Sequence, residues 1–196
     1  MNDFGTFFMI LISITVFYVY LENKAADVTF VKHGKIEFLV RNLDDKEKAA
    51  RLLSDICSGL TSIINHLYEK RDSYDSDKKG GIERMKAKFN HNAVVESSPG
   101  NKYTSYSINK GEKIVFCLRS KDNSQELVDL NTMMFVAIHE LAHLMSQSIG
   151  HTKEFWDNMK FLLKCGIEIN VYTKQDFNKS PQDYCGTKIT DTPLNS

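Results

Sequence analysis

The sequence predicts an α+β fold with one N-terminal transmembrane helix. Several segments place apolar residues at helical spacing, short segments between them have the composition of strands, and one run of 18 residues near the N-terminus has no charge. The apolar share of 42% and the charged share of 26% are typical of a globular domain. Lys+Arg and Asp+Glu balance at 25 each, so the charge gives no indication of nucleic-acid binding.

The uncharged run Phe4–Leu21 predicts a membrane anchor, which we assign to residues 1–24. As a helix it would be about 27 Å long, enough to cross the hydrocarbon core of a bilayer. Basic residues follow the run and none precede it: Lys24, Lys32, Lys35 and Arg41. The positive-inside rule therefore predicts a single-pass membrane protein with its domain on the cytoplasmic side. One alternative is a cleaved signal peptide, which is disfavoured because the run lacks a basic n-region. The other is a buried core helix, which is disfavoured because the run is apolar on all sides.

Residues 25–186 are predicted to form one domain, and residues 187–196 a flexible tail. The domain starts with a hairpin, because Val28–Val31 and Lys35–Val40 flank a His-Gly turn.

A long helix is predicted next, starting at a capping box formed by Asp44 and Glu47. Its apolar residues recur at helical spacing: Leu53, Ile56, Leu60, Ile63, Ile64 and Leu67. The polar stretch Asp72–Gly81 predicts a mobile surface loop, and a short helix is expected over Ile82–Phe89.

Three strands and two helices are expected in the rest of the domain. The strands are Ala93–Ser97, Thr104–Ile108 and Lys113–Arg119, of which the last two form an antiparallel hairpin around an Asn-Lys-Gly turn. The helices are Glu126–Ser148 and Thr152–Lys164, each with an apolar stripe.

The four cysteines are widely spaced and include no C-x-x-C pair: Cys57, Cys117, Cys165 and Cys185. This spacing argues against a cysteine-based zinc knuckle. We expect four reduced, buried thiols, in agreement with a cytoplasmic location, while the count also allows two disulfides.

The motif His139-Glu140-Leu-Ala-His143 lies in a predicted helix whose segments Thr132–Val136 and Leu144–Met145 carry no charge, which indicates that this helix is buried. Because His139 and His143 are one helical turn apart, their imidazoles leave the same face and can bind one zinc ion. Glu140 can reach a water molecule on that ion and act as general base. The alternative is a pair of hydrogen-bonded core histidines, but a buried helix rarely carries three such side chains without a use for them.

A catalytic zinc site needs a third protein ligand and one open position. His151 is the favoured candidate, because Gly150 can reverse the chain between the two helices and direct His151 to the metal. Acidic residues farther along the chain are alternatives: Glu154, Asp157, Glu168 and Asp176.

The stretch His139–Trp156 resembles minimal zincins, namely WLM-type and SprT-like proteases and bacterial metal-dependent hydrolases with a H-E-L-A-H motif, a later His and a Phe-Trp pair. The segments Ile114–Arg119 and Asn131–Trp156 are also similar to membrane-anchored metallopeptidase-like proteins of large DNA viruses and algae. WLM proteins usually place the third His two residues closer to the second.

The resemblance implies a zincin-like fold, with a small antiparallel sheet packed on the active-site helix. It also implies Zn2+ as cofactor, held by the two helical His and the downstream His, with the Glu as base. An edge strand of the sheet would pair with an extended peptide, and Lys113–Arg119 is our candidate, with an ordinary core strand as an equal alternative for this segment. Tyr172 or Tyr184 would steady the oxyanion.

The expected function is that of a membrane-anchored zinc metallopeptidase. Its expected partners are a protein or peptide substrate and a viral or host membrane, with no nucleic acid, because the sequence shows no basic DNA-binding tail or ubiquitin-like domain. Two alternatives remain. The first is a zinc-stabilised structural or assembly protein of a viral membrane, in which a fourth protein ligand would close the metal site. The second is a hydrolase of non-peptide substrates.

Overall fold

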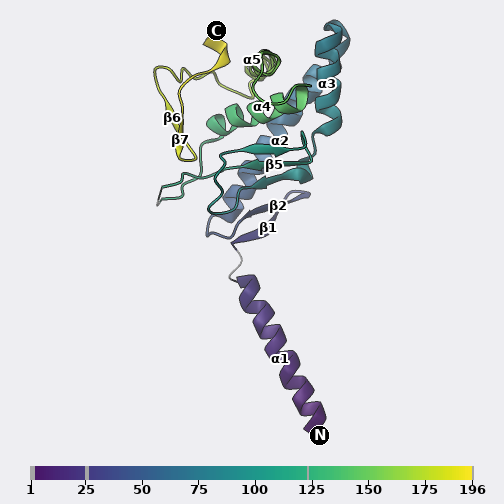
Figure 1. The fold of residues 1–196 in the computed structure, drawn as a ribbon, viewed down its shortest axis with the longest axis vertical. Helices are drawn as coiled ribbons and strands as arrows, with labels where there is room; N and C mark the ends of the chain where they lie inside the picture. Colours follow the sequence, from purple (N-terminus) through teal and green to yellow (C-terminus); the bar gives the residue numbers. More distant parts are fainter. Residues whose placement is uncertain (1–2, 25–26, 123, 196) are drawn as a thin grey trace.

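The computed structural model describes residues 3–24, 27–122 and 124–195. Figure 1 shows helix α1 (Asp3–Lys24) extending away from the rest of the chain, in which helices and a small sheet pack together. The apolar side chains of α1 from Phe7 to Tyr20 are between 46% and 66% exposed.

The predicted transmembrane anchor is wrong: within the described part of the chain, no helix has both the length and the apolar character that crossing a membrane requires. A span needs about 20 consecutive apolar residues. In α1 the polar residues Thr6, Ser13 and Thr15 interrupt the apolar sequence. The predicted single-pass membrane localisation depended on that span and is wrong with it, and the predicted membrane contact through Phe4–Leu21 is not supported.

The predicted N-terminal hairpin is confirmed by strands β1 (Val28–His33) and β2 (Ile36–Arg41), which pair antiparallel with His33 opposite Ile36. Between them Gly34 has a φ of 62°, in the left-handed region that favours glycine. Phe38 and Val40 of β2 are fully buried.

Helix α2 (Lys46–Glu69) packs its apolar stripe into the core, as its sequence spacing predicts. Its N-cap is Asp45, whose side chain makes no capping hydrogen bond, so the predicted capping box is wrong. The Asp45 carboxylate instead accepts a hydrogen bond of 2.8 Å from Nη1 of Arg119.

The predicted mobile loop over Asp72–Gly81 is wrong, because most of that segment is helical. A 3-10 turn η1 (Arg71–Ser73) leads into helix α3 (Ser76–Lys88), and the Asp75 side chain caps this helix by accepting from the amide of Lys78. Local capping therefore outweighs the polar composition that suggested a loop. Gly81 lies against Met145, and a Cβ at this position would be 3.0 Å from Cγ of Met145.

A second 3-10 turn, η2 (His91–Ala93), leads into the mixed sheet, which has the strand order β3–β5–β4. Its strands are β3 (Val94–Glu96), β4 (Tyr106–Ile108) and β5 (Lys113–Phe116). The predicted antiparallel hairpin of β4 and β5 is confirmed, but β3 pairs parallel with β5, so a wholly antiparallel sheet is wrong. As a result β5 is the central strand, and Lys113–Arg119 is not the edge strand that we predicted.

Helices α4 (Leu130–Met145) and α5 (Lys153–Glu168) pack against each other, and α4 also contacts α2 and α3. The chain ends in a hairpin of β6 (Gln182–Tyr184) and β7 (Thr187–Ile189), followed by a 3-10 turn, η3 (Pro193–Asn195). In the segment where we expected a flexible tail, Thr192 is buried and η3 contacts α5.

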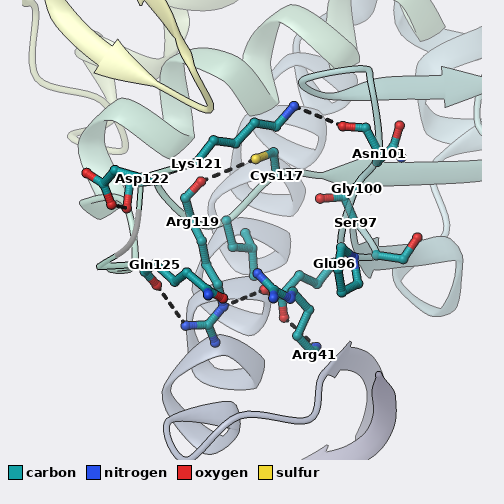
Figure 2. A pocket seen from close by; sticks show the side chains of 14 residues that line it. Arg41, Glu96, Ser97, Gly100, Asn101, Cys117, Arg119, Lys121, Asp122 and Gln125 are labelled. Carbon is teal, nitrogen blue, oxygen red and sulfur yellow. Dashed lines mark hydrogen bonds and ion pairs between the residues drawn. The ribbon is translucent and has the colours of Figure 1, made fainter. Parts of the chain in front are cut away.

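A buried ionic cluster ties the sheet to the start of α2, and Figure 2 shows its members Arg41, Glu96 and Arg119. Arg119 is 4% exposed, and its Nε donates to Oε1 of the equally buried Glu96 at 2.8 Å. The other oxygen of Glu96 accepts from the backbone amide of Arg41 at 2.7 Å. With Asp45 also bound to Arg119, the cluster joins β2, β3 and α2.

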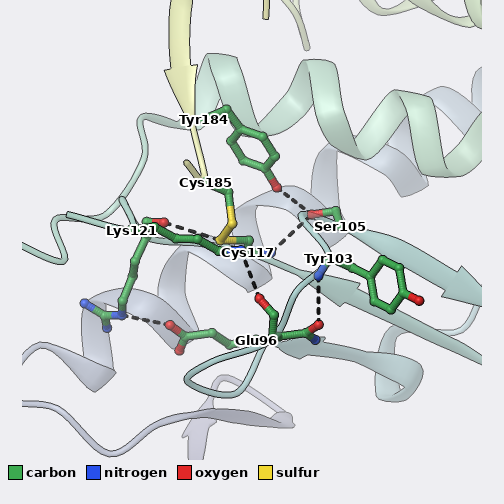
Figure 3. The surroundings of a disulfide bond; sticks show 9 residues. Glu96, Tyr103, Ser105, Cys117, Lys121, Tyr184 and Cys185 are labelled. Carbon is green, nitrogen blue, oxygen red and sulfur yellow. Dashed lines mark hydrogen bonds and ion pairs between the residues drawn. A yellow bond between two sulfur atoms is a disulfide. The ribbon is translucent and has the colours of Figure 1, made fainter. Parts of the chain in front are cut away.

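The prediction of four reduced cysteines is wrong in part, because Cys117 and Cys185 form a disulfide across 68 residues of sequence (Figure 3). Tertiary packing brings their Cα atoms to 6.1 Å, a proximity that sequence spacing does not show. Cys57 and Cys165 are free and buried, and burial raises the pKa of the Cys57 thiol to about 12.

Candidate metal centre

Helix α4 places two histidines on one face, next to the sheet. The helix follows its N-cap Asp129, whose side chain accepts from the amide of Thr132, and nearly every residue from Thr132 to Met145 is buried. His139 and His143 are the partly exposed exceptions, with ring centroids 5.0 Å apart. Both side chains therefore leave the otherwise buried helix on one side, as the four-residue spacing predicts.

His151 joins them from the loop after α4. Its Nε2 lies 3.0 Å from Nε2 of His139, and its ring centroid is 5.1 Å from that of His143. The ligand atoms of the three histidines all lie within 4.8 Å of one another. Among the described residues, this is the one group of His, Cys, Asp or Glu side chains close enough to hold a metal ion.

The loop between His143 and His151 is fixed from both sides. Nζ of Lys110 donates to the backbone carbonyls of residues 146, 147 and 148 at 2.6–3.0 Å. The Glu154 carboxylate accepts from the amides of Gln147 and Ser148 at 2.7 and 2.9 Å. Gly150 then turns the chain with a φ of 79°. These contacts hold the loop between the second and third histidine.

The acidic alternatives for the third position have other partners. Glu154 binds the loop amides, and these hydrogen bonds lower its pKa to about 2. Glu168 pairs with Lys70 and His66, Asp157 with Lys153, and Asp176 with Lys179. The structure thus brings His151, and none of these carboxylates, to the two helical histidines.

Two aromatic residues of α5 support the histidines. Phe155 is fully buried, and its ring centroid is 4.3–4.8 Å from the centroids of all three imidazoles. Trp156 stacks on His151 with an interplanar angle of 30°. The aromatic pair suggested by the sequence therefore packs against the cluster, with Phe155 at its base and Trp156 against its exposed member.

Burial favours neutral histidines in this cluster. Desolvation, with smaller contributions from the neighbouring histidines, lowers the pKa of His139 to about 3 and that of His143 to about 4. Near neutral pH both rings therefore keep a lone pair, which a cation needs for coordination.

Glu140 is buried beside the cluster with unused hydrogen-bonding capacity. It is 3% exposed, and its Oε2 has no hydrogen-bond partner among the described residues. Burial raises its pKa to about 7, an effect opposed by a hydrogen bond with the Ser107 side chain. The residue lines a cavity of about 440 Å3 together with His139, His143, His151 and Ser107. The carboxylate thus faces the space in which a reacting molecule would lie.

Sequence reasoning missed Lys110, Ser105 and Ser107, which line the same cavity. Only the Asn-Lys-Gly turn gave a signal for this part of the site, and it indicated a hairpin. Of the two tyrosines considered, Tyr184 lies near Glu140, whose charge contributes to raising the Tyr184 pKa. The ring of Tyr172 packs against Phe135 in the core.

Helix α4 carries two histidines and an adjacent glutamate, lies beside a small mixed sheet, and is followed by a third histidine. This is the arrangement of a minimal metallopeptidase. The chain belongs to the WLM-like metallopeptidase family: residues 84–195 match the WLM domain. Over 188 residues it is 32% identical to an uncharacterized protein of Acanthamoeba polyphaga mimivirus, covering 94% of each chain.

Two further comparisons cover less of the chain or are more distant. An uncharacterized protein of Invertebrate iridescent virus 3 is 37% identical over 84 residues, 43% of this chain and 48% of that protein. A crystal structure of a Wss1 mutant from Saccharomyces cerevisiae matches 67% of this chain and 88% of its own, with a TM-score of 0.48 and 19% identity.

Proposed function

We propose that the protein is a zinc-dependent peptidase, in which His139, His143 and His151 hold the metal and Glu140 is the general base. The observation that carries this proposal is the meeting of three imidazoles, within 4.8 Å of one another, with the buried Glu140 carboxylate, whose Oε2 has no hydrogen-bond partner in the described part of the chain. Membership of the WLM-like metallopeptidase family supports it.

The residues present fit zinc. Three neutral imidazoles are a common protein ligand set for a catalytic zinc ion, and the depressed pKa values of His139 and His143 keep them neutral. Zinc in such a site lowers the pKa of a water molecule to about 7 and polarises a carbonyl group. The unpaired oxygen of Glu140 is suited to hold and orient that water molecule.

Glu140 then moves one proton twice. As the water oxygen forms a bond to the peptide carbonyl carbon, the carboxylate accepts the proton that the water loses. It gives this proton to the nitrogen of the scissile bond as the C–N bond breaks, leaving a carboxylic acid and an amine. A pKa of about 7 allows Glu140 to do both near neutral pH.

The edge of the sheet gives the substrate a place to bind. β4 is the edge strand next to the cavity, and Ser105, Tyr106 and Ser107 line that cavity. An extended peptide can pair with such an edge through main-chain hydrogen bonds. We therefore propose that the peptide substrate pairs with β4 and not with Lys113–Arg119.

The structural alternative requires a fourth protein ligand that closes the metal site. Among the described residues only the three histidines gather, and a cavity of about 440 Å3 opens beside them. This arrangement favours catalysis over a purely structural zinc. A hydrolase of non-peptide substrates would use the same residues, and a substrate screen separates it from a peptidase.

Two substitutions test the proposal on the full-length protein loaded with zinc, with denatured casein and a mixed peptide library as substrates. Glu140→Gln is expected to keep one zinc per chain and to lose cleavage by at least about 10²-fold. His151→Ala is expected to lose zinc, whereas the exposed control His33→Ala should keep it. Zinc is measured by mass spectrometry of the dialysed protein. Unchanged cleavage by Glu140→Gln, or no cleavage by zinc-loaded wild type, would overturn the proposal.

A further inference from the structure

We propose that the Ser105 hydroxyl donates a hydrogen bond to the substrate carbonyl oxygen, and that Tyr184 orients this hydroxyl. The inference rests on the proposed peptidase function and adds to it the group that stabilises the developing oxyanion. It assigns Ser105 a catalytic role and Tyr184 a positioning role.

Ser105 lies beside the cavity at the three histidines. It immediately precedes β4 and lines the cavity together with His139 and Glu140. Ser107, two residues on, forms a hydrogen bond with the Glu140 side chain. Ser105 and Ser107 thus line the same cavity as the active-site helix residues, one just before β4 and one within it.

Figure 3 shows the two groups that hold the Ser105 oxygen. The backbone amide of Cys117 donates to Oγ of Ser105 at 3.1 Å, and the Tyr184 hydroxyl lies 2.5 Å from the same atom. A serine hydroxyl has one donor and two acceptor positions.

The direction of the Tyr184 hydrogen bond follows from burial. Tyr184 is 4% exposed, and burial is the main cause that raises the pKa of its phenol, so the group keeps its proton. A buried phenol proton without an acceptor would be costly, and Ser105 Oγ is its recorded partner among the described residues. Tyr184 is therefore the donor. Both acceptor positions of Ser105 are then occupied, and its own proton is available to a carbonyl oxygen in the cavity.

The disulfide keeps both partners of Ser105 in place. Cys117 supplies the amide that binds Ser105, and its sulfur is bonded to Cys185, the neighbour of Tyr184. One covalent bond thus fixes the two donors relative to each other, although they come from β5 and the β6–β7 hairpin. Preorganised donors of this kind are effective because they need no rearrangement as charge develops.

Three variants of the full-length zinc enzyme test the inference: Ser105→Ala, Tyr184→Phe and the double variant. Ser105→Ala is expected to lower kcat by about 10²-fold with KM and zinc content unchanged, as for the loss of an oxyanion donor. Tyr184→Phe is expected to lower kcat by about tenfold. Because Tyr184 acts through Ser105, it should have no further effect in the Ser105→Ala background.

A binding measurement gives a second readout that does not depend on turnover. A phosphinate peptide, with a tetrahedral phosphinate in place of the scissile bond, should bind Ser105→Ala about 10²-fold more weakly than wild type. Ser105→Thr keeps the hydroxyl and should retain most of the affinity and of kcat. The matched controls are Tyr172→Phe, which removes a phenol packed against Phe135, and Ser62→Ala on the exposed face of α2.

The outcomes separate this inference from the proposed function. If wild type cleaves peptides and Ser105→Ala has the wild-type kcat and phosphinate affinity, the inference is wrong and the peptidase function stands. Additive effects in the double variant would overturn the positioning role of Tyr184. If zinc-loaded wild type cleaves nothing, the proposed function fails and the inference fails with it.

Discussion

Lys110 connects the hairpin turn between β4 and β5 to the segment that carries the third histidine. Its ammonium group donates to three consecutive backbone carbonyls just after the C-terminal end of α4. The same contacts fix the start of the loop to His151. The position of His151 therefore depends on a residue that is distant from it in sequence.

Lys110→Met is expected to weaken zinc binding by about tenfold, the lower end of the range for residues that orient metal ligands. The methionine keeps most of the side-chain volume but cannot donate to the three carbonyls. Competition with a chelator of known affinity measures the change. Lys113→Met, at an exposed position on β5, is the matched control, and an equal loss in both variants would contradict this role for Lys110.

Glu154 makes the loop sensitive to acid. Its hydrogen bonds to the amides of Gln147 and Ser148 lower its folded-state pKa from the ordinary 4.5 to about 2. A depressed folded pKa stabilises the protein above the unfolded pKa, and this stabilisation is lost as pH falls from about 4.5 toward 2. We expect Glu154→Gln to flatten this part of the stability curve, measured by urea unfolding of the metal-free protein between pH 5 and pH 2.5. The same slope in wild type and variant would refute the role of Glu154.

Among single residues, the sequence alone predicted those that share one helix or an adjacent turn. His139, Glu140 and His143 follow from helical spacing, and His151 from a glycine at a chain reversal. Ser105 and Tyr184 are 79 residues apart and meet only in the folded chain. No local sequence pattern predicts a contact between residues so far apart in the chain.

At the scale of elements, the long helices were predictable because each buries a continuous apolar stripe. The boundaries of α2, α4 and α5 agree with their sequence periodicity to within a few residues. The strands of the sheet have only three or four residues each, too few for a reliable alternating pattern. Their order, and the parallel pairing of β3 with β5, depend on tertiary packing.

The disulfide is the element-scale feature with the largest expected effect on stability. It closes a long loop and fastens the β6–β7 hairpin to the end of β5. Cys185→Ser is expected to lower the free energy of unfolding by about 2 to 5 kcal/mol, and reduction of wild type should have a similar effect. Denaturant unfolding with and without a phosphine reductant measures both.

The two free cysteines provide the control for the disulfide. In a Cys57→Ala, Cys165→Ala variant the disulfide is intact, so the loss of stability on reduction should equal that of wild type. If wild type were insensitive to the reductant, the predicted contribution of the disulfide would be wrong.

At the scale of the whole molecule, the match to the WLM domain begins at residue 84, yet the site also depends on the chain before it. α2 packs against α4, and Gly59 lets the two helices approach, since a Cβ there would be 2.9 Å from Cε of Met134. The Arg119 cluster joins the same N-terminal segments to the sheet. The three histidines that could hold a metal ion thus sit beside a core to which both parts of the chain contribute.

The central claim is a zinc ion held by three histidines, with one position left open. X-ray absorption at the zinc K-edge of the loaded, full-length protein tests it most directly. The account predicts three imidazole nitrogens at about 2.0 Å and one oxygen from water, with no sulfur. A zinc–sulfur distance of about 2.3 Å, or a fourth protein ligand in place of water, would contradict it.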